Sequence, residues 1–114
     1  MQLLPNDAKK IEIEGSTVDF YTFIKDGIIN YYFDTSEVGP PEPMVNAMAG
    51  LQLLDKNSKL VMINHKPPMG LFPKIQQNYA YEIEEIEDGK HIIIFTYKSN
   101  TRQQTDFSQN TCAG

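Results

Sequence analysis

Strand-like and helix-like segments alternate along this chain, and that order leaves few folds open. Near the N-terminus, "KIEIEG" alternates apolar and acidic residues, while "STVDFYTFI" and "IINYYFDTS" are rich in β-branched and aromatic residues around a "KDG" turn. These stretches predict a β-hairpin, with a third strand as the alternative. Further along, "KLVMINH" predicts a short apolar strand, and "NYAYEIEEIEDGKHIIIFTYK" predicts two strands around a Glu-Asp-Gly-Lys turn.

Two helices are expected between these strands. Apolar residues at helical spacing predict a first helix from about Glu42 to Leu54, and the residues in this pattern are Met44, Ala47, Met48, Leu51 and Leu54. A second helix would place Leu71, Phe72, Ile75 and Tyr79 on one face, with Pro73 in its first turn, where a missing N–H costs little. The order is a hairpin followed by β-α-β-α-β-β. It predicts an α+β fold, a two-layer α/β sandwich with both helices on one face of a mixed sheet.

The chain length suits one domain. With 114 residues, 40% of them hydrophobic, the chain is long enough for one core and too short for two. We expect residues 1–98 to form it, with 1–31 as an N-terminal β extension and 32–98 as the domain core. Residues 99–114 are polar apart from Phe107, which predicts a flexible C-terminal tail.

The last predicted strand is apolar on both faces. Because side chains alternate along a strand, Ile92, Ile94 and Thr96 share one face, and Ile93, Phe95 and Tyr97 share the other. The helices can cover only one of these faces. The second face needs the N-terminal hairpin, the tail or another subunit. A homodimer through this second sheet face is therefore one of the hypotheses.

Charge and cysteine content restrict the partners and the compartment. A net charge of -5 argues against nucleic acid or an anionic membrane as the main partner and favours a protein or a small molecule. The start has no signal-peptide pattern, and no stretch approaches the ~20 apolar residues of a membrane span. The single cysteine, Cys112, cannot form an internal disulfide, which fits a reducing compartment. These features predict a cytoplasmic protein.

The stretch "GPPEPM", residues 39–44, stands at the start of the first expected helix. Pro41 and Pro43 preset the backbone of a first turn whose N–H groups have no partner within the helix. Glu42 complements the positive end of the helix dipole by ~0.3 to 1 kcal/mol. This pattern favours a structural helix start. The alternative is that Pro40, Pro41, Glu42 and Pro43 form part of a binding site.

A second candidate group lies in "VMINHKPPM". The thioethers of Met62 and Met69 with the imidazole of His65 are the ligand types that suit Cu(I), and a His–Met pair can ligate haem. Methionines more often fill core gaps, however, and a histidine before prolines more often caps a loop. His65 follows a strand next to a helix start, where α/β sheets gather ligands. A small-molecule or switch site is therefore expected around His65, Lys66 and the turn from Pro40 to Glu42.

Nothing in the sequence favours catalysis. Glu82 and Glu84 share one face of an acidic strand, with Ile83 and Glu85 on the other, which is typical of a solvated sheet edge and not of an acid–base pair. No Gly-rich phosphate loop, CxxC motif or Ser-His-Asp order occurs. We expect a protein that is not an enzyme, with no cofactor.

From about Tyr32 to Tyr97 the chain resembles a known family. The stretches "YYFDTSEVGPPEPMVNAMAGL", "KLVMINHKPPMGLFPKIQQNYAYEIEE" and "GKHIIIFTYK" resemble a bacterial domain-of-unknown-function family related to the sulfur carrier TusA (SirA-like). The resemblance implies a β-α-β-α-β-β sandwich like the C-terminal domain of a bacterial initiation factor. Residues 1–31 and the tail lie outside it.

The resemblance also sharpens the functional hypotheses. Sulfur carriers of this kind have a Cys-Pro-x-Pro motif at the helix start, where the helix dipole stabilises a thiolate. Pro40 stands at the position of that cysteine, so the resemblance implies a docking shape without its reactive thiol. We expect a non-catalytic module that binds a protein partner. The alternatives are an accessory protein of sulfur relay, with Cys112 as acceptor, and a metal- or haem-binding module around His65, by loose analogy with hemerythrin-like and nitrogen-oxide proteins.

Overall fold

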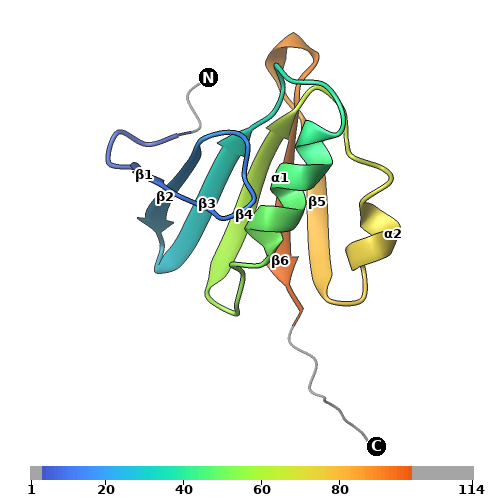
Figure 1. Cartoon of the computed structure of the whole chain (residues 1–114). Coiled ribbons are helices and arrows are strands. Elements are labelled where there is room, and N and C mark those ends of the chain that lie inside the picture. Colours follow the sequence, from blue (N-terminus) through green and yellow to red (C-terminus); the bar gives the residue numbers. More distant parts are fainter. Residues whose placement is uncertain (1–3, 99–114) are drawn as a thin grey trace, which may run out of the picture.

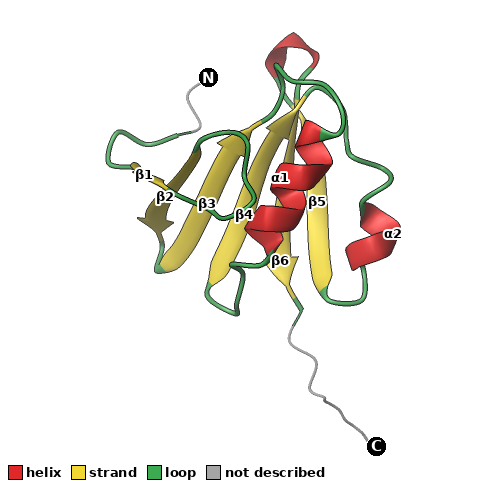
Figure 2. Ribbon diagram, in the orientation of Figure 1, coloured by secondary structure: helices red, strands yellow, loops and turns green. Residues whose placement is uncertain are grey.

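The computed structural model describes residues 4–98. Figure 1 shows the sheet with the α-helices in front of it, and Figure 2 separates strands from helices by colour. The elements, in chain order, are β1 (Lys9–Ile11), β2 (Phe20–Lys25), β3 (Ile28–Asp34), α1 (Glu42–Leu51), β4 (Ser58–Asn64), α2 (Phe72–Ile75), β5 (Tyr79–Glu85), the short 3-10 helix η1 (Glu87–Gly89) and β6 (His91–Tyr97).

The six strands form one mixed sheet in the order β1-β2-β3-β4-β6-β5. Only β3 and β4 are parallel, and α1 is the crossover that joins them. Both helices lie on the same side of the sheet (Figure 1). This arrangement confirms the predicted α+β two-layer sandwich and the order of its elements. The N-terminal segment supplies β1 and β2, which widen the sheet beyond β3.

The helix ends differ from the sequence prediction. α1 starts at Glu42 as expected but ends at Leu51, because the next backbone bonds, from Leu53 N to Gly50 O and from Leu54 N to Leu51 O, are tight turns. α2 is a single turn, and Tyr79 belongs to β5, not to the face of a helix. The prediction that Leu54 and Tyr79 lie in helices was therefore wrong. Leu54 is nevertheless buried, and the Tyr79 hydroxyl donates to Leu51 O at 3.0 Å.

The core lies between the sheet and the helices. Across the strands Phe20, Phe33, Met62 and Ile93 are in register, and all four are fully buried on the helix side. α1 approaches this layer closely at Gly50, where an added Cβ would lie 2.7 Å from Leu60 Cδ1. Met48, expected on the apolar side of the helix, is 40% exposed and so was misplaced.

The second sheet face has no helix over it in the described part of the chain. Ile93 and Phe95 are fully buried on the helix side, so Ile92 and Ile94 point to the other face, as the strand alternation predicted. β1 and β2 extend the sheet beside β3 and do not cover this face, and Pro5, which precedes them, borders it near Phe23 and Ile94. Between residues 4 and 98, no helix has the length and apolar character that crossing a membrane requires.

Candidate functional site

Two proline-rich loops meet at one end of the sheet and line an open cavity of about 430 Å³, which we call the proline cavity. One loop follows β3 and the other follows β4. Because these strands are parallel neighbours, their carboxyl ends lie at the same edge, and the two loops leave the sheet side by side. The lining residues are Pro40, Pro41, Pro43, Met44, Asn64, His65, Lys66, Pro67, Pro68, Met69 and Gly70.

The first wall of the cavity is the start of α1. The Pro40–Pro41 peptide bond is cis, and Pro41 precedes the helix, where its carbonyl accepts the Val45 N–H at 3.0 Å. Pro43 is buried in the first turn. Glu42 does not line the cavity, because its carboxylate accepts a hydrogen bond from the Thr17 hydroxyl. The structure therefore does not bring Glu42 to the cavity with the other predicted residues, and its place in a binding group stays a prediction.

The second wall is the loop from β4 to α2, and Asn64 shapes it. This side chain is 2% exposed and donates from its amide nitrogen to Lys66 O at 2.9 Å. Its oxygen accepts from the buried Thr35 hydroxyl at 3.1 Å, which ties the ends of β3 and β4 together. Sequence reasoning missed Asn64. The available signal was a polar residue that closes an otherwise apolar strand.

The structure brings most of the predicted residues together. Pro40, Pro41 and Pro43 share the cavity with His65 and Lys66. Sequence reasoning also missed Met44, Pro67, Pro68 and Gly70 as members of this site.

The proposed metal ligands do not converge. Met69 lines the cavity with His65, but Met62 is fully buried in the core and does not line it. Among residues 4–98, no group of three or more His, Cys, Asp or Glu side chains is placed to hold a metal ion. The possible sulfur acceptor, Cys112, lies outside the described residues.

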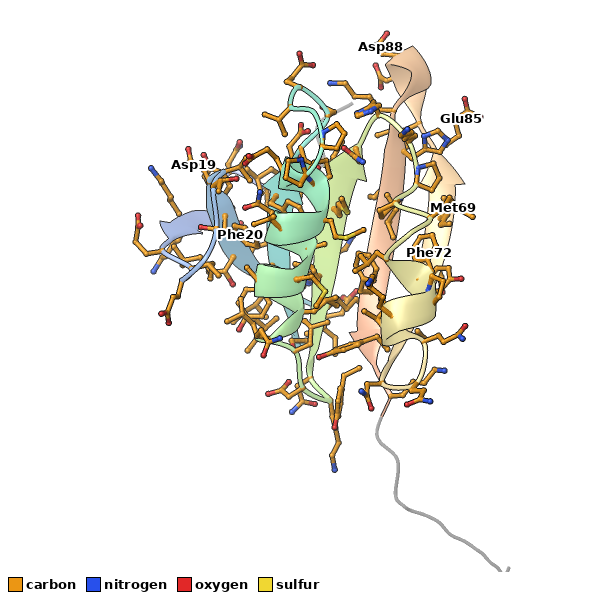
Figure 3. All side chains as sticks on the ribbon, turned by 45° about the vertical axis from the view of Figure 1, so that its right-hand side comes forward. Asp19, Phe20, Met69, Phe72, Glu85 and Asp88 are labelled. Carbon is orange, nitrogen blue, oxygen red and sulfur yellow. The ribbon has the colours of Figure 1, made fainter. Side chains whose placement is uncertain are left out.

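The lining determines what the cavity can bind. Proline has no backbone N–H, so walls built from five prolines offer apolar surface and few donors. The side chains of His65 and Lys66 are exposed, and they are the lining groups that favour an acceptor or an anion. Figure 3 shows Met69 on the loop that precedes α2, where it is 67% exposed. The cavity therefore suits an apolar group flanked by acidic or acceptor groups.

Exposed apolar side chains continue from the cavity onto α1. Val45 and Met48, in the turns that follow Met44, are 39% and 40% exposed. Large apolar side chains exposed beside a concave site are typical of a surface that binds another protein.

Comparison with known proteins places the site within a family. Residues 32–97 match a family described as uncharacterised conserved protein, DUF2249. No curated protein and no solved structure matches the chain. The matched segment is more than half of the 114 residues and contains every residue that lines the proline cavity. The chain therefore belongs to the uncharacterised conserved family DUF2249.

Proposed function

We propose that this protein is a non-catalytic binding module that holds a protein partner at the proline cavity. The observation that carries the proposal is the convergence of two proline loops, from parallel β3 and β4, around one apolar cavity. Both loops belong to the segment that defines the family, whereas the β1–β2 extension does not. The cavity thus lies within the matched segment and not in the N-terminal addition.

The chemistry of the cavity favours a partner with an apolar anchor. An aliphatic or aromatic side chain would enter between the prolines and contact the flexible thioethers of Met44 and Met69, which adapt to different shapes. Acidic residues beside that anchor would lie near His65 and Lys66. Val45 and Met48 would extend the contact along α1.

The resemblance to TusA-like sulfur carriers supports the same proposal. Pro40, at the position of the carrier cysteine, lines the cavity, so the helix start keeps a surface for docking and offers no thiol there. A sulfur-relay role would have to rest on Cys112, far along the chain. We take partner docking as the function.

Site-specific photocrosslinking in the native host tests this proposal. A photoreactive amino acid would replace Met69, at the mouth of the cavity, or Ile24, which is equally exposed (70% against 67%) but lies on the N-terminal extension. We expect a discrete protein adduct from position 69 and none from position 24. The partner is sought in the cytoplasm, the compartment that the cysteine content favours.

Two outcomes would count against the proposal. If positions 69 and 24 gave the same set of adducts, the contacts would be non-specific. If position 69 gave only a small-molecule adduct or none, the cavity would not be a protein-docking site.

A further inference from the structure

We infer that the second face of the sheet is the interface of a homodimer in which two copies pack face to face. The strand registers define this open face, and its apolar residues include Tyr21, Phe23, Tyr32, Val61, Ile92 and Ile94. They come from β2, β3, β4 and β6; Val61, in the middle, is only 8% exposed, and the other five are partly exposed. Neither α1 nor α2 lies over this face (Figure 1), and η1 borders it at the end where Asp34 and Ile63 lie. This inference is independent of the proline cavity.

One row of residues across the open face favours a second copy of this chain as its partner. Reading across the paired strands from β1 to β5, the residues in register are Lys10, Tyr21, Tyr32, Val61, Ile94 and Glu82. The row has an apolar centre, a positive charge at one end and a negative charge at the other. When this row is laid over a second copy of itself in the opposite order, opposite charges meet at both ends and apolar side chains meet in the middle.

A two-fold axis parallel to the strands produces that reversal. It places Lys10 of each copy over Glu82 of the other, Tyr21 over Ile94, and Tyr32 over Val61. An axis across the strands would instead place Lys10 over Lys10 and Glu82 over Glu82, which like-charge repulsion disfavours. In this row charge favours the first orientation, which gives the same patch on both copies, as a closed dimer requires. In the next row along the strands, the same axis places the exposed Asp34 over Ile63 of the other copy.

The groups at the two ends of the row are available for this contact. Lys10 pairs with Asp19 of its own chain at 3.4 Å, but both side chains are more than half exposed, and an exposed pair of this kind is weak. Glu82 and its neighbour on the same face, Glu84, are exposed on the edge strand β5. In the middle of the face, packing would remove the remaining apolar surface of Tyr32 and Ile94 from water.

Sedimentation equilibrium of the full chain tests the apolar centre. We expect a reversible dimer whose dissociation constant rises about tenfold or more in Ile94→Glu, because each dimer would bury two carboxylates without partners. The matched control is Ile83→Glu in the neighbouring β5, one register position from Ile94 but on the helix side and 41% exposed. This control should dimerise as the wild type does, and circular dichroism would verify that both variants are folded.

Charge reversal tests the orientation. Glu82→Lys should weaken the dimer, Lys10→Glu should do the same, and the double variant should recover most of the wild-type affinity. Glu85→Lys makes the same charge change on the opposite face of β5 and should have no effect.

Three results would overturn the inference. The first is a monomer at every concentration up to roughly 1 mM, where even a millimolar dissociation constant would be visible. The second is a dimer that Ile94→Glu and Ile83→Glu affect equally. The third is a double charge-reversal variant that dimerises no more tightly than either single variant. That result would reject the proposed two-fold axis.

Discussion

Asn46 links the loop between β1 and β2 to α1, in addition to the pairing of β2 with β3. It is fully buried in α1, and its oxygen accepts the Thr17 N–H at 2.7 Å from the loop between β1 and β2. Its amide nitrogen donates to the Glu42 carbonyl at 2.8 Å and to the Thr17 hydroxyl at 2.8 Å. One polar side chain thus forms hydrogen bonds with groups of two segments. In the same network, the Thr17 hydroxyl donates to the Glu42 carboxylate, which does not line the cavity.

We expect Asn46→Ala to lower the free energy of unfolding by about 3 kcal/mol, because it leaves several partly buried groups without partners. Urea denaturation would measure the change. Asn57→Ala, at an exposed side chain, is the control and should stay within roughly 0.5 kcal/mol of the wild type. Equal effects of the two changes would show that the Asn46 network is not stabilising.

At the scale of single elements, α1 shows what the sequence could predict and what it could not. Its start was predictable, because prolines at 41 and 43 suit a first turn. Its end was not, because Leu54 continues the helical spacing even though a turn after Leu51 brings it into the core. Tyr79 misled in the same way: it lies four residues after Ile75, so a strand residue at that position imitates a helix face.

The cavity was predictable only in part for a related reason. Each proline stretch and His65 could be identified from local sequence. Their convergence depends on the parallel pairing of β3 with β4, which is a long-range contact. The contribution of Gly70, whose added Cβ would meet Met44 Cε at 3.4 Å, depends on the same convergence and has no local signal.

Because α1 packs closely on the sheet, we expect a glycine-to-alanine change in this helix to lower the stability of the protein. Alanine in place of glycine inside a helix normally stabilises by about 1 kcal/mol. We expect Gly50→Ala to destabilise by about 2 kcal/mol, because its Cβ would lie 2.7 Å from Leu60 Cδ1 and 3.0 Å from Phe20 Cε2. Thermal or urea unfolding would measure it. Gly39→Ala, with nothing within 4 Å of the added Cβ, is the control. A stabilised Gly50→Ala protein would contradict the close approach of α1.

At the scale of the whole molecule, the two proposed surfaces lie on different parts of the sheet. The proline cavity lies beyond the carboxyl ends of β3 and β4, whereas the open face lies on the side opposite the helices. A dimer through the open face would therefore leave both cavities accessible. Ile94→Glu should separate the copies without weakening the binding of a partner at the cavity.

The most direct test of the central claim is the affinity of the crosslinked partner for a protein whose cavity is filled. Gly70→Ile would place a branched side chain in the cavity beside Met44, and neither Gly70 nor the control position, Gly39, has a positive φ that would strain the backbone. Isothermal titration calorimetry should give a dissociation constant at least about tenfold higher for Gly70→Ile and an unchanged value for Gly39→Ile. Wild-type affinity in the folded Gly70→Ile protein would contradict partner binding at the proline cavity.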